Sequence, residues 1–148
     1  MISLDKALAI DPKDKDALYD EGFDLERLGN YTGAIEFYDK VLAIDPHYVR
    51  ALTDKGIALG NLGNHTGAME FYDKALAIDP HDVNALNNKG VILNSLRNYT
   101  GAIEFYDKAL AIQPNDTYTL NNKGLLLNSL GNYTGAILYY DKVLAILC

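Results

Sequence analysis

Apolar residues recur along the chain at the spacing of amphipathic helices. One typical stretch carries them at Leu52, Gly56, Leu59 and Leu62, and then at Ala68, Phe71, Tyr72, Ala75 and Leu76. Residues three or four positions apart lie on one face of an α-helix, whereas a half-buried strand alternates apolar and polar residues one by one. The helical spacing is interrupted at Gly63-Asn64. The stretch therefore predicts two helices joined by a tight turn, with the axes closest at Gly56 and Ala68, and with Tyr72 and Leu76 filling the space toward the next helix pair.

The same pattern returns with a period of 34 residues. A fixed period of this length indicates a repeat architecture, because one helix hairpin cannot bury its apolar faces alone and stacks on the next. The rows that share the period are Pro12, Pro46, Pro80 and Pro114; Gly22, Gly56, Gly90 and Gly124; Ala34, Ala68, Ala102 and Ala136; and Tyr38, Tyr72, Tyr106 and Tyr140. We predict one all-α domain over 1–148, with a partial repeat (second helix only) at 1–12 and full repeats at 15–46, 49–80, 83–114 and 117–148.

Residues that begin and end helices flank the predicted elements. An Asp or Asn side chain can accept the unpaired N–H groups of a helix start, and glycine can take the left-handed conformation that ends a helix. The expected caps are Asp14, Asp82 and Asp116 for the first helices and Asn30, Asn64, Asn98 and Asn132 for the second, with turns at Gly29, Gly63 and Gly131. Two positions break these rows: Tyr48 caps poorly, and Arg97 in place of glycine predicts a strained third turn.

The pattern Leu-x-x-x-Gly-x-x-Leu, followed by Ala-x-x-x-Tyr-x-x-Ala and a final Pro, resembles the tetratricopeptide repeat family across essentially the whole chain. The resemblance implies an α-solenoid of antiparallel helix hairpins, a right-handed superhelix whose first helices line a concave groove that binds peptides or partner proteins. One departure from the family pattern is a charged residue before each glycine, namely Glu21, Lys55, Lys89 and Lys123. We expect these lysine stems to lie along the surface with solvated heads.

The first helices vary between repeats, whereas the second helices are nearly copies of one another. Packing explains the constant half, so the variable half holds the candidate peptide-binding residues. They are Asp16, Tyr19, Asp20, Arg50, Thr53, Asp54, Asn84, Asn87, Asn88, Tyr118, Asn121 and Asn122. An Asn amide both donates and accepts, so an Asn row can pair with peptide groups whatever the ligand sequence; equally, Asn88 and Asn122 can bond only to neighbouring helices or water. The acidic N-terminal part of this face favours a basic ligand.

The last predicted helix suggests a second, structural function. It carries Leu138-Tyr139-Tyr140 where the other repeats have Glu-Phe-Tyr, and no proline follows it. An exposed apolar patch of this kind tends to find a partner. We expect self-association through Leu138, Tyr139, Tyr140, Val143, Leu144, Leu147 and Cys148, as a homodimer or, together with segment 1–12, as head-to-tail chains. A non-enzymatic protein-binding module is thus the leading interpretation, and a self-assembling solenoid is the alternative.

Composition and charge narrow the possible partners. Thirteen Lys and Arg stand against twenty Asp and Glu, a net charge of −7 that opposes nucleic-acid binding. The sequence has neither an apolar run of membrane-spanning length nor the basic and apolar start of a secretory signal, so we expect a cytoplasmic protein without a membrane partner. Cys148 is the sole cysteine, so no disulfide forms within the chain.

The chain carries no residue set typical of catalysis. We find no Ser/His/Asp or Cys/His combination and no glycine loop that would cradle a phosphate, which predicts neither enzymatic activity nor a cofactor. His47, His65 and His81 are spread over separate turns, so we expect them to be exposed and not to bind a metal. Asn-x-Thr sequons recur at the four capping asparagines and at Asn115. Capping accounts for the first four without glycosylation.

Overall fold

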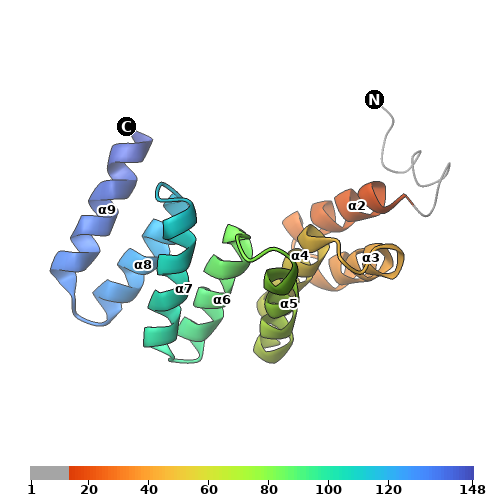
Figure 1. Cartoon of the computed structure of the whole chain (residues 1–148), viewed down its shortest axis with the longest axis horizontal. Helices are drawn as coiled ribbons and strands as arrows, with labels where there is room; N and C mark the ends of the chain where they lie inside the picture. The colour runs from red at the N-terminus through yellow and green to blue at the C-terminus, as the bar shows by residue number, and fades with distance from the viewer. Residues whose placement is uncertain (1–13) are drawn as a thin grey trace. The chain divides into compact units, whose positions relative to one another are not determined.

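The computed structural model describes residues 14–148, which form helices joined by short turns and contain no strand. In chain order the helices are Lys15–Arg27 (α2), Tyr31–Ile44 (α3), Val49–Asn61 (α4), His65–Ile78 (α5), Val83–Ser95 (α6), Tyr99–Ile112 (α7), Thr117–Ser129 (α8) and Tyr133–Leu147 (α9) (Figure 1). They pack pairwise as the hairpins α2/α3, α4/α5, α6/α7 and α8/α9. The predicted all-α hairpin fold is confirmed. The partial repeat predicted at 1–12 lies outside the described residues.

Two compact units make up the chain, one up to Pro80 and one from His81 onward. The N-terminal unit holds α2 to α5, and its α4 packs against both helices of the preceding hairpin. The C-terminal unit holds α6 to α9, and its α8 packs against α6 and α7 in the same way. Within each unit, the stacking of hairpins covers faces that a single hairpin would leave exposed. That 1–148 acts as one domain stays a prediction.

Most of the predicted helix caps form. The Oδ1 atoms of Asn30, Asn64, Asn98 and Asn132 accept the backbone N–H three residues on, at 2.9–3.0 Å. Asp14 and Asp82 cap α2 and α6, and Tyr48 makes no side-chain cap. The prediction for Asp116 is wrong in one respect. It precedes α8 but makes no bond to a backbone N–H, because its Oδ2 instead accepts the hydroxyl of Thr119 at 2.5 Å.

The turns inside the hairpins adopt the left-handed backbone that the glycines predict. The φ angles of Gly29, Gly63 and Gly131 are 82°, 86° and 83°. Arg97 takes the same conformation, with φ 64°. A side chain makes this conformation unfavourable by about 1–2 kcal/mol, so the strained third turn is confirmed.

A tyrosine against a glycine forms the centre of each hairpin. Tyr38, Tyr72 and Tyr106 are almost fully buried. A Cβ placed on Gly56 would come within 2.6 Å of the Tyr72 ring, so only glycine fits there. Tyr72 makes this close contact within its own hairpin, and the expectation that it also fills the space toward the next pair stays a prediction.

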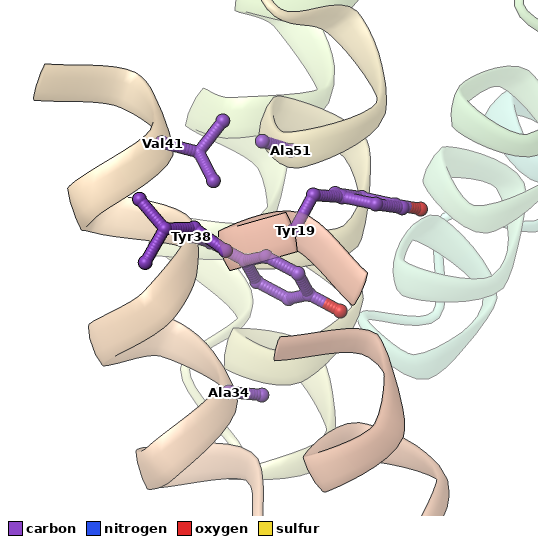
Figure 2. Close-up of a cluster of buried hydrophobic side chains, with 6 residues drawn as sticks. Tyr19, Ala34, Tyr38, Val41 and Ala51 are labelled. Carbon is purple, nitrogen blue, oxygen red and sulfur yellow. The ribbon is translucent and has the colours of Figure 1, made fainter. Parts of the chain in front are cut away.

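The core of the N-terminal unit continues from one hairpin to the next. Figure 2 shows Tyr38 and Val41 of α3 beside Tyr19 of α2 and Ala51 of α4, all buried in one cluster. The Tyr19 and Tyr38 rings lie 5.7 Å apart between centroids. In the C-terminal unit, Leu126 of α8 joins Tyr106 of α7 in the equivalent way.

The lysines that precede the glycine row lie over aromatic rings of the second helices. Their Nζ atoms are 4.3 Å from Phe71 (Lys55), 4.5 Å from Phe105 (Lys89) and 4.6 Å from Tyr139 (Lys123), each measured to the ring centroid. Lys55 also pairs with Asp39, and Lys123 with Asp107. The side chains of Lys55 and Lys123 are only 17% and 11% exposed, so the expectation of solvated heads is wrong for these two.

Candidate protein-interaction surfaces

The first-helix face of the N-terminal unit combines aromatic and charged side chains. The Tyr19 hydroxyl of α2 donates to Asp54 Oδ2 of α4, which ties the two helices together. The guanidinium of Arg50 lies 4.7 Å from the centroid of the Tyr19 ring. Its Nη2 also donates to the Tyr48 hydroxyl at 2.8 Å, and that hydroxyl donates to Asp16 Oδ1 at 2.9 Å. Both helices thus contribute to one connected polar cluster.

Burial changes the acid–base properties of this cluster. The pKa of Glu26 is raised to about 7, first because burial disfavours its charge and second because Asp54 is nearby. Burial and the Asp54 carboxylate also raise the pKa of Tyr19. The sequence did not single out Tyr48 for this site, because its role depends on contacts across helices rather than on spacing.

The first-helix face of the C-terminal unit is built from amides. Asn122 Nδ2 of α8 donates to Asn87 Oδ1 of α6 at 3.2 Å. Asn88 Nδ2 donates to the backbone carbonyl of Asn84, one turn earlier, at 2.8 Å. For Asn88 and Asn122 these bonds correspond to the second of the two predicted uses, bonding to neighbouring protein groups.

Burial divides the twelve predicted binding residues into three groups. Six are exposed: Asp16, Asp20, Arg50, Asn84, Tyr118 and Asn121. Asn88 and Asn122 are half-buried, whereas Tyr19, Thr53, Asp54 and Asn87 are buried. The expectation that all twelve face a ligand is revised for the buried four, because at most 9% of each is exposed.

The last helix exposes several of its predicted association residues. Leu138, Leu144 and Leu147 are 56%, 58% and 70% exposed, and Cys148 is also exposed. Tyr139, Tyr140 and Val143 are half-buried. Leu138 occupies the position that exposed glutamates hold in the other repeats, at Glu36, Glu70 and Glu104. An apolar side chain therefore replaces a charged one on this surface of α9.

The described residues offer no metal site and no membrane span. Nowhere in 14–148 do three or more His, Cys, Asp or Glu side chains gather so as to hold a metal ion. None of the helices described is both long and apolar enough to cross a membrane. His47 and His81 are exposed, but His65 is half-buried and its Nδ1 has no hydrogen-bond partner, which corrects the prediction for that residue.

Stacked helix hairpins with variable first helices define a helical-repeat protein of the kind that binds other proteins. Three family models, each described as tetratricopeptide repeat, match residues 25–86, 83–116 and 105–137. The chain belongs to the tetratricopeptide repeat family. Members of this family generally mediate protein–protein interactions and are non-enzymatic scaffolds.

Solved structures share the fold. A crystal structure of MamA is 25% identical with a TM-score of 0.79, over 96% of this chain and 83% of that one. A structure of MamA from Desulfovibrio magneticus RS-1, from residue 41 to the end, is 24% identical with a TM-score of 0.79. The match covers 96% of this chain and 80% of that one. PilF of Pseudomonas aeruginosa is 26% identical with a TM-score of 0.83, and the match covers 96% of this chain and 65% of that one. The search of curated proteins finds no match.

Proposed function

We propose that this protein is a non-enzymatic interaction module that holds an extended segment of a partner polypeptide against its first helices. The observation that carries the proposal is the exposed amide surface of the C-terminal unit. Asn84 and Asn121 are exposed there, and Asn88, one helical turn after Asn84, is half-buried. Each amide can donate to a peptide carbonyl and accept from a peptide N–H, so together they suit a ligand backbone rather than one side-chain sequence.

The N-terminal unit would add selectivity for charge. Asp16 and Asp20 are exposed on its first-helix face, whereas Arg50 is stacked on Tyr19 and Lys15 pairs with Asp45. A ligand segment that carries Lys or Arg would be steered toward this face and would associate faster at low salt.

Peptide selection followed by affinity measurement tests the proposal. A ligand is selected from a displayed peptide library with the parent protein, and its Kd is measured by fluorescence polarisation. Replacing Asn84, Asn88 and Asn121 together by Ala should weaken binding by about 1–3 kcal/mol, because ligand peptide groups lose their partners. Asn122 is kept, since its bond to Asn87 links α6 to α8.

A matched variant shows whether a loss of affinity depends on the position of the amides or only on the loss of amide side chains. Gln113 and Asn115 are exposed amide residues of the same unit, but they lie in the turn between α7 and α8, outside the predicted face. Their replacement by Ala should leave the Kd unchanged. Equal affinity of the Asn84/Asn88/Asn121 variant and the parent for the selected peptide would refute the proposal.

Self-association through α9 is the second candidate, and the exposed Leu138 favours it. In the other repeats an exposed glutamate occupies the position of Leu138, whereas α9 exposes the apolar side chains of Leu138, Leu144 and Leu147, which favour contact with a partner. Sedimentation equilibrium under reducing conditions should show mass increasing with concentration for the parent. Leu138→Glu combined with Leu147→Lys should remain monomeric. A parent that is monomeric at every concentration rules this candidate out.

A further inference from the structure

A pocket of about 530 Å³ opens between α3, α4 and α5 of the N-terminal unit. Apolar side chains from all three helices line it, among them Leu42, Leu52, Phe71 and Ile78. None of the twelve predicted binding residues lines this pocket. It is therefore a second surface, separate from the first-helix face.

The volume of the pocket lies within the range of known binding sites. Ligand sites in proteins typically measure about 300–1,000 Å³ and are mostly apolar with few polar groups. Leu52 is buried at 4% exposure, whereas Ile78 at the edge is 41% exposed. Apolar surface thus leads from the solvent to a buried floor.

Two lysines give the rim its charge. Lys55 and Lys74 lie 4.3 Å and 4.5 Å from the centroid of the Phe71 ring. Asp39, the carboxylate that lines the pocket, is bound to Lys55 at 2.5 Å. Lys74 is 51% exposed and pairs with Glu70 at 3.4 Å across one helical turn. Exposed pairs of this kind are weak, so Lys74 can exchange Glu70 for a better-placed carboxylate.

We propose that this pocket binds a partner polypeptide at an apolar side chain followed by acidic residues. The apolar side chain enters between Leu42, Leu52 and Ile78, and the carboxylate that follows it pairs with Lys74 at the rim. Two lysines and one carboxylate line this pocket, so once Lys74 exchanges Glu70 for a ligand carboxylate the pocket selects acidic segments, which the acidic first-helix face of the same unit disfavours.

Two labelled peptides test the proposal on the full chain. The first is Ser-Gly-Leu-Phe-Glu-Glu-Gly-Ser, and the second has Lys in place of both Glu residues; fluorescence polarisation gives each Kd. The acidic peptide should bind, and about tenfold more tightly than the basic one, the size of effect expected for one charge-assisted contact. No binding of the acidic peptide, or equal binding of the two, overturns the proposal.

Variants locate the binding. Lys74→Glu should weaken the acidic peptide about tenfold. Lys108→Glu is the matched control, because Lys108 pairs with Glu104 at 3.3 Å and lies 4.4 Å from the Phe105 ring but does not line the pocket. An equal loss in both variants overturns the proposal.

Filling the pocket provides a test that does not depend on charge. Ala77 lines the pocket and is exposed, so Ala77→Phe should abolish peptide binding while circular dichroism remains that of the parent. Ala111→Phe, at the same position of the next repeat, should bind like the parent. If Ala77→Phe instead lowers the mass measured by sedimentation, the occupant is a second copy of this chain and the proposal fails. The Asn84/Asn88/Asn121 variant should bind the acidic peptide normally, which separates this proposal from the preceding one.

Discussion

The two units link neighbouring first helices at the same register but with different chemistry. In the N-terminal unit the Tyr19 hydroxyl of α2 donates to the Asp54 carboxylate of α4. In the C-terminal unit Asn122 of α8 donates to Asn87 of α6. Each pair is 35 residues apart, one period plus one residue. The repeat thus determines where a polar bridge lies between hairpins, whereas the residues at that position determine whether the bridge is charged or neutral.

Removing each bridge tests whether the charged bond of the N-terminal unit stabilises the fold more than the neutral bond of the C-terminal unit. Asp54→Ala should lower the free energy of unfolding by about 2 kcal/mol, because it removes a buried hydrogen bond to a charged group. Asn122→Ala should lower it by about 1 kcal/mol, because the neutral bond contributes less. Chemical denaturation with urea measures both values. If the two losses are equal, the charge of Asp54 adds nothing to the bridge and the comparison between the units fails.

The repeat and its turns could be predicted from the sequence because they depend on local residues. The 34-residue period, the Asn caps and the strain at Arg97 each follow from residue type and position. Asp116 fails to cap α8 for a local reason as well, because the hydroxyl of Thr119, one turn further along, donates to its carboxylate.

The candidate site could be predicted only in part, because one residue along a helix changes the direction of a side chain by about 100°. Asn87 and Asn88 are adjacent in the sequence, yet Asn87 is 2% exposed and Asn88 is half-buried. The pocket beside Phe71 was not predicted, because three helices form it and its residues are ordinary packing residues of the repeat. The burial of Lys55 could not be predicted for the same reason, because Phe71 and Asp39, which contact it, lie on two different helices.

The pH dependence of stability gives a second comparison, because the N-terminal unit holds a half-buried carboxylate, Glu26, near its bridge. The pKa of Glu26 is raised from its usual 4.5 to about 7 by burial and by Asp54. Between these two values the folded protein holds a proton that the unfolded chain has released, so this residue makes stability fall as pH rises from about 4.5 to about 7. Above that range its unfavourable effect is complete and constant.

Glu26→Gln should remove this dependence. The variant should match the parent near pH 4 and be more stable by about 1–2 kcal/mol at pH 8, a value reduced for the partial exposure of the side chain. Urea unfolding at a series of pH values gives the difference. Glu36→Gln, at an exposed position of the same unit, is the control and should follow the parent. A constant difference between Glu26→Gln and the parent at all pH values would contradict the raised pKa.

Substitutions in the turns should have the smallest effect on the free energy of unfolding, and they compare equivalent positions of the two units. Gly63 in the N-terminal unit and Arg97 in the C-terminal unit both have a positive φ, 86° and 64°. Arg97→Gly should raise the free energy of unfolding by about 1 kcal/mol, because glycine adopts this backbone without steric strain. Gly63→Ala should lower it by about the same amount, and strain alone would be the cause, since nothing lies within 4 Å of the added Cβ. Thermal unfolding monitored by circular dichroism ranks the two variants against the parent. If Arg97→Gly is no more stable than the parent, the Arg97 side chain makes contacts that offset the strain, and the third turn is then as stable as the glycine turns.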